Sequence, residues 1–149
     1  MRYSRYPTPD EMLQPLPREV SAAKCIESAD AYYLLTAGES SSLTISHLLG
    51  VVYAAYFINE TIEGEWPDEL FRVAEAALRE RAVSGERSGK FDIPAALQVE
   101  IQRVLSLYVH HLASVPIFIH VEAEKRVAAF LSSGLSSPIP QKPKQQPMH

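Results

Sequence analysis

The segment from Leu43 to Ile58 limits the possible folds more than any other, because it reads LTISHLLGVVYAAYFI and carries almost no polar side chain. A membrane-spanning helix needs about 20 predominantly apolar residues, whereas this run has about 16 and includes Ser46 and His47. A helix that is apolar on all sides normally lies at the centre of a bundle. We therefore expect a buried central helix here and no membrane partner.

Proline, glycine and capping residues divide the body of the chain into five predicted helices. Apolar residues recur in them at helical spacing, and no segment alternates with the period of a strand. The pattern predicts an all-α, single-domain bundle of about five helices over residues 18–134. The predicted helices run from Pro17 to Gly38, from the serines at 40–42 to Gly64, from Pro67 to Gly85, from a cap at Asp92 to a break at Pro116, and from a cap at Ser114 to Gly134.

Both ends of the chain are rich in proline. Residues 1–17 contain four prolines, which forbid a continuous helix and favour an extended arm with at most one short turn near Asp10 to Leu13. Residues 135–149 alternate proline with lysine and glutamine and hold too little apolar surface to offset the entropy of folding. We expect this tail to be disordered, either as a solubilising end or as a docking peptide.

Composition narrows the class of protein. The single cysteine, Cys25, excludes an internal disulfide and a cysteine-based zinc site, which is typical of a chain kept in a reducing cytosol. No apolar run follows Met1, so no signal peptide is expected and the predicted location is cytoplasmic. An isoelectric point near 5.7 and a net charge of −4 argue against nucleic acid as a partner, since binding to phosphate needs a positive field.

The sequence motifs of common enzymes are missing. The neighbours His110 and His111 would point about 100° apart on a helix, so they cannot both ligate one metal ion from a regular turn. Cys25 lies within a predicted helix, where a thiol usually packs as a small apolar group. We expect no metal, no cofactor and no catalytic residue, with His47 and one of His110 and His111 buried in the core. An enzyme that uses His110 or His111 is the third hypothesis.

Tyrosines offer an alternative function, that of a helical protein that binds a small ligand in a tyrosine-lined pocket. Their helical spacing is also explained by ordinary packing in the core. The residues concerned are Tyr32, Tyr33, Tyr53, Tyr56 and Tyr108.

The strongest functional signal is an asymmetry of charge. Between Cys25 and Phe71 the chain has eight acidic residues and no lysine or arginine. Two of the acids, Glu60 and Glu63, come at the end of the predicted central helix, where the helix dipole is already negative and a cation would be preferred. With their neighbours they surround the only tryptophan, and an exposed aromatic side chain ringed by charge is a common anatomy for a binding hot spot. We name this set the acidic corner: Glu60, Glu63, Glu65, Trp66, Asp68 and Glu69.

These observations favour a noncatalytic intracellular regulatory or adaptor protein, of the inhibitor, immunity, antiactivator or chaperone type. We expect its acidic corner to bind a basic surface on a protein partner. The many large apolar residues on only five helices also predict a homo-oligomer. An alternative for Trp66 is that it folds back onto the following helix as a hydrophobic staple.

Overall fold

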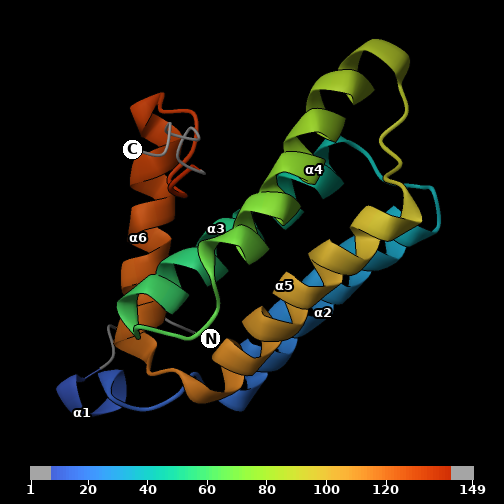
Figure 1. Ribbon diagram of the computed structural model, residues 1–149. Helices are drawn as coiled ribbons and strands as arrows, with labels where there is room; N and C mark the ends of the chain where they lie inside the picture. The colour runs from blue at the N-terminus through green and yellow to red at the C-terminus, as the bar shows by residue number, and fades with distance from the viewer. Residues whose placement is uncertain (1–7, 142–149) are drawn as a thin grey trace, which may run out of the picture.

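The computed structural model describes residues 8–141, and in that range it contains six helices and no strand (Figure 1). The predicted all-α single-domain bundle is therefore confirmed: five long helices pack together, preceded by one short turn of helix. The elements are α1 (Pro9–Met12), α2 (Arg18–Thr36), α3 (Ser42–Thr61), α4 (Asp68–Ser88), α5 (Ala95–Ser114) and α6 (Ile117–Ser133).

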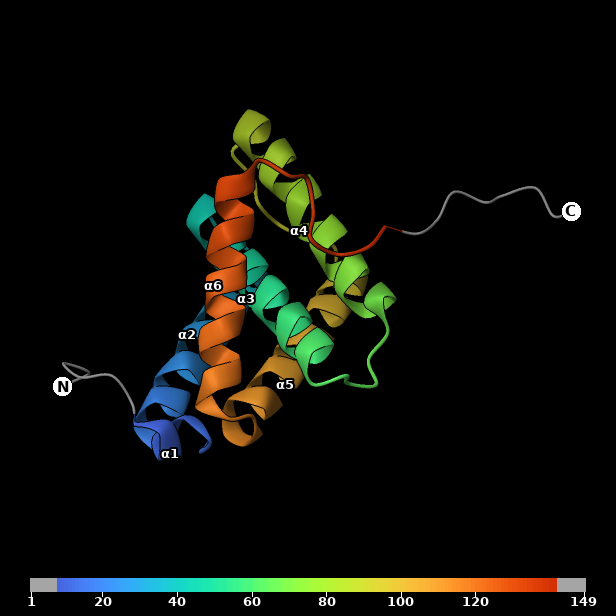
Figure 2. The ribbon, with the colours of Figure 1, turned by 90° about the vertical axis from the view of Figure 1, so that its left-hand side faces the viewer.

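The predicted central helix is α3, and it packs against α2, α4, α5 and α6 (Figures 1 and 2). It begins with a capping box in which the Ser41 hydroxyl accepts from the Thr44 N–H and the Thr44 hydroxyl accepts from the Ser41 N–H. Ile45, Leu48 and Val52 are completely buried. Among the described helices, α3 alone is long and apolar enough to cross a membrane, and 61% of its most apolar 18-residue window is buried inside the bundle.

The other helices do not cover α3 evenly. Helices α2 and α5 lie side by side, and α4 packs against both α3 and α5. Helix α6 packs along α3 but does not touch α4, so a groove remains between α4 and α6 with α3 as its floor. Because α6 has only one long neighbour, Phe118 and Leu131 stay 42% and 67% exposed.

Three predicted helix boundaries are wrong, one by about a turn and two by two residues. Helix α4 continues through Gly85 and ends at Gly89, which has a left-handed backbone (φ 76°). Gly85 is buried because the Phe91 ring packs on it, and a methyl group there would overlap the ring. The next two helices begin after Pro94 and Pro116 instead of after the predicted caps at Asp92 and Ser114.

The predicted arm agrees with the structure where it is described. Residues 9–12 form the expected short turn, and the Ile117 N–H donates to the Gln14 carbonyl at 2.8 Å, which attaches the arm to the start of α6. Residues 1–7 lie outside the described range.

Residues 137–141 pack against α4, so the expectation of a disordered tail is wrong for them (Figure 2). Ile139 is 2% exposed. The Ser137 hydroxyl lies 2.7 and 2.9 Å from the two oxygens of the Glu75 carboxylate, and Arg72 donates to the Pro140 carbonyl at 2.6 Å. Composition alone misses this contact because it depends on one apolar side chain and two polar partners more than sixty residues away. The rest of the predicted tail, 142–149, lies outside the described residues.

Replacing Ile139 with alanine should lower the free energy of unfolding by about 2 kcal/mol, because a fully buried side chain leaves a cavity. The exposed Leu135 in the same segment is the matched control, and its replacement by alanine should change stability by less than about 0.5 kcal/mol. Urea denaturation of both variants tests this. Equal stability of the two variants would show that the segment does not pack on α4.

Candidate functional site: the acidic corner between α3 and α4

The acidic corner occupies the connection between α3 and α4. The backbone turns sharply there: the Ile62 N–H donates to the Ile58 carbonyl at 3.0 Å and the Gly64 N–H donates to the Asn59 carbonyl at 2.8 Å. Between them, Glu63 takes a left-handed conformation with φ 53°, which is uncommon for a residue other than glycine. These bonds use carbonyl groups at the end of α3 that have no partner within the helix.

Asn59 holds the rest of the connection in place. Its side-chain amide donates to the Trp66 carbonyl at 2.9 Å, and the residue is only 5% exposed. Gly64 passes so close that a methyl group there would overlap the Asn59 amide. The Asn59 Oδ1 atom is buried without a hydrogen-bond partner among the residues that the structure describes. Sequence reasoning missed Asn59, although a polar residue ending an apolar run, five positions before a glycine, was a usable signal.

Two carboxylates of the acidic corner are paired with arginine. Glu60 lies 2.6 Å from the Arg126 guanidinium, which comes from α6 and also lies over the Phe57 ring, 4.4 Å from its centroid. Glu69 pairs with Arg72, one turn later on α4. The stretch without lysine or arginine is therefore partly balanced by cations outside it, by Arg72 just beyond its end and by Arg126, which lies 66 positions from Glu60 along the chain.

The remaining carboxylates leave the acidic corner negative. Glu63, Glu65 and Asp68 form no ion pair within residues 8–141. Trp66 is 49% exposed, so half of its side chain faces solvent beside them. The predicted site residues thus lie on the connection and on the helix ends that flank it, with Glu60 in α3 and with Asp68 and Glu69 in α4.

The local field also acts on a neighbouring tyrosine. The Tyr56 hydroxyl donates to Glu60 at 3.3 Å. Burial, followed by the charges of Glu60 and Asp68, raises the pKa of Tyr56 to about 12, so it stays a neutral donor at physiological pH.

The histidines are arranged differently from the prediction. His111 is buried and His110 is exposed, which confirms that one of the pair is a core residue. His47 is exposed, so its predicted place in the core is wrong, while His120 is buried. A ring nitrogen of His120 lies 3.1 Å from the His111 carbonyl. Among the described residues no group of three His, Cys, Asp or Glu side chains is placed to hold a metal ion.

The predicted tyrosines do not converge on one cavity. Tyr53 lines the groove between α4 and α6, whereas Tyr32 lines a second groove between α2 and α5 that also includes Cys25. Tyr33 is 66% exposed, and Tyr56 packs edge-on against Phe71 with ring centroids 5.7 Å apart.

Comparison of the chain with protein family models, with curated protein sequences and with solved structures finds no match. Function is therefore inferred from the chain's own residues and their geometry.

The buried histidines predict a loss of stability in acid. Burial lowers the pKa of His111 to about 4 and also lowers the pKa of His120. A histidine with a lowered pKa in the folded state is protonated more readily in the unfolded chain. Its contribution to stability is therefore complete above the ordinary histidine pKa of about 6.5 and is lost as the pH falls toward 4.

We expect His111→Gln to remove most of this pH dependence, on the order of 3 kcal/mol, while His110→Gln at the exposed neighbour keeps it. The measurement is the free energy of unfolding in urea at about pH 7 and about pH 4.5, compared between the variants so that the shared titration of carboxylates cancels. The prediction would be contradicted if the change in unfolding free energy between the two pH values were the same in the unmodified protein, His111→Gln and His110→Gln.

Proposed function

We propose that this protein is a noncatalytic regulatory or adaptor protein that binds a basic surface on a protein partner through its acidic corner. The observation that carries the proposal is the half-exposed Trp66 beside three carboxylates without an ion pair in the described chain. The arginines that reach the acidic corner, Arg126 and Arg72, are paired with Glu60 and Glu69. The other charges are left to attract a cation on another molecule.

The order of the connection supports binding. Asn59 fixes the backbone at Trp66, and the bond from Gly64 to the Asn59 carbonyl closes the turn. A loop that is already held in one conformation loses little entropy when a partner binds, so more of the contact energy appears as affinity. Tryptophan is among the residues most often found at the centre of a binding hot spot.

The arrangement gives less support to the other functions considered. His110 is exposed while His111 is buried, so the adjacent pair does not face one reaction space. Helix α3, which carries many of the large apolar residues that predict a homo-oligomer, is mostly covered by four helices of the same chain. Self-association stays a prediction, as does the cytoplasmic location.

Reversing the charges of Glu63 and Glu65 to lysine should slow association with the partner by about tenfold or more, because electrostatic steering speeds encounter. The partner is recovered by capture on the immobilised full chain, and its association rate is then measured as a function of salt. The rate for the unmodified protein should fall steeply from low to physiological ionic strength.

Glu86→Lys is the matched control, since Glu86 is exposed near the other end of α4 and the same reversal there should leave the rate nearly unchanged. Binding should also shift the fluorescence of Trp66 to shorter wavelength as its ring leaves water. A rate that is insensitive to salt, or equal in the two charge-reversal proteins, would remove the proposal.

A further inference from the structure

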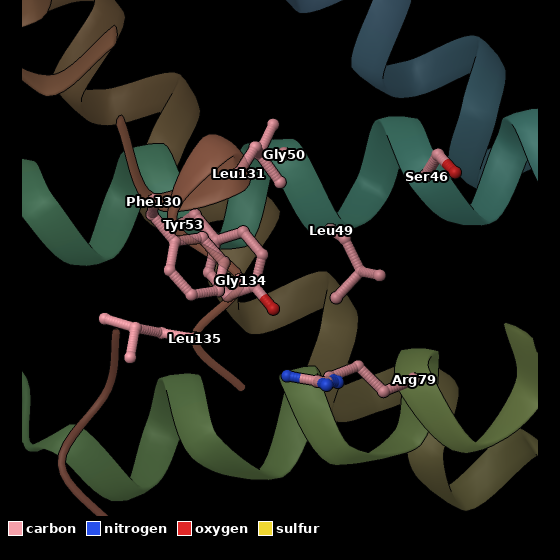
Figure 3. Close-up of a pocket in the computed structure, with 9 residues that line it drawn as sticks. All are labelled: Ser46, Leu49, Gly50, Tyr53, Arg79, Phe130, Leu131, Gly134 and Leu135. Atoms are coloured by element: carbon pink, nitrogen blue, oxygen red, sulfur yellow. The ribbon is translucent and has the colours of Figure 1, made fainter. Parts of the chain in front are cut away.

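The groove between α4 and α6 has a second set of chemical features, separate from the acidic corner. Its volume is about 450 Å³, within the range of small-molecule sites, which is roughly 300–1,000 Å³. Helix α3 forms the floor and Arg79 of α4 faces residues at the end of α6 across it (Figure 3). The lining residues are Ser46, Leu49, Gly50, Tyr53, Arg79, Phe130, Leu131, Gly134 and Leu135.

Arg79 is the one charged residue in this lining. Figure 3 shows its guanidinium and the Tyr53 hydroxyl pointing toward one another across the groove. Within the described chain Arg79 has a single ion pair, to Glu75 at 3.7 Å, and its side chain is 43% exposed. Arg79 also interacts with the Tyr53 hydroxyl. A guanidinium carries five N–H donors, so these two partners leave some of them available.

Glu75 is engaged by other groups. Its buried carboxylate accepts from the Tyr53 hydroxyl at 2.8 Å and from the Ser137 hydroxyl at 2.7 Å. Glu75 is thus satisfied mainly by neutral donors, and it fixes Tyr53 and the segment after α6 at the edge of the groove. Arg79 remains as the group that can meet an incoming anion.

Gly50 keeps the floor of the groove open. It lies in the interior of α3, where glycine is less favourable than alanine because it loses more conformational freedom on folding. A side-chain carbon at this position would meet nothing within 4 Å. No close approach within the described chain therefore calls for a glycine there, whereas a molecule lying in the groove would occupy the space above it.

We propose that this groove binds a small amphipathic carboxylate, with its apolar chain over Gly50, between Leu49 and Leu131, and its carboxylate on Arg79. The apolar lining and the single cation select this chemistry over a cationic or a fully polar ligand. Leu131 and Leu135 at the mouth are 67% and 69% exposed, and burying them would add to the binding. The site does not depend on the acidic corner, which lies at the other end of α3.

Isothermal titration calorimetry of the full chain with dodecanoate, below its micellar concentration, tests this site. Saturable binding of one molecule per chain is expected, and dodecyltrimethylammonium, which has the same chain and the opposite charge, should bind at least about tenfold more weakly. Arg79→Gln should weaken dodecanoate binding by about tenfold or more, while Arg103→Gln, on exposed α5 surface, should leave it within about twofold.

Gly50→Leu should abolish dodecanoate binding by filling the floor of the groove. Gly50→Ala should weaken dodecanoate binding and raise the melting temperature. Weaker binding in a more stable protein would show that the loss of binding is not due to unfolding. Reversing Glu63 and Glu65 should leave dodecanoate binding unchanged. The proposal is overturned if dodecanoate shows no saturable binding up to millimolar concentration, if the cationic probe binds equally well, or if Arg79→Gln has no effect. Capture of a protein partner that is lost with Gly50→Leu, without dodecanoate binding, would also overturn it.

Discussion

The burial of α3 is the constraint on which the rest of the structure depends. An apolar helix without a polar face has to be covered, and four other helices of this short chain cover most of its surface. Burial is nearly complete over the C-terminal half of α3, from Val51 to Asn59, and weaker over its N-terminal half. At the C-terminal end the chain emerges through Asn59 into the connection that carries Trp66, and toward the N-terminal half the space above Gly50 stays open between α4 and α6. Both proposed binding sites thus follow from how one helix is enclosed.

The distribution of charge follows from the same packing. Helix α6 lies along α3 and brings Arg126 to Glu60. The cation there also interacts favourably with the negative, C-terminal end of the α3 dipole. This pair anchors α6 near the acidic corner but leaves Glu63 and Glu65 to solvent. The acidic corner therefore has two parts. Glu60 and Glu69 form ion pairs with Arg126 and Arg72 within the fold, and the other carboxylates are available to a partner.

The sequence predicts the elements that local signals determine and misses those that distant contacts determine. The central helix, the start of α4 after Pro67 and the left-handed stop at Gly134 agree with the structure. Gly85 was taken as a stop because nothing nearby indicates that Phe91 packs on it, and the segment around Ile139 was taken as disordered because its partners lie on α4. The members of the acidic corner were found because they are neighbours in the sequence, whereas Asn59 and Arg126 act through geometry that only the fold reveals.

The central functional claim is that Trp66 lies exposed in a negative field on an ordered connection, and collisional quenching of its fluorescence tests this most directly. Trp66 is the only tryptophan, so the signal belongs to the acidic corner alone. A negative surface concentrates cations and repels anions over roughly a Debye length. We predict that caesium quenches Trp66 more efficiently than iodide does, relative to free tryptophan, and that reversing Glu63 and Glu65 to lysine inverts this preference. Equal quenching by the two ions, or a Trp66 that neutral acrylamide cannot reach, would contradict the account.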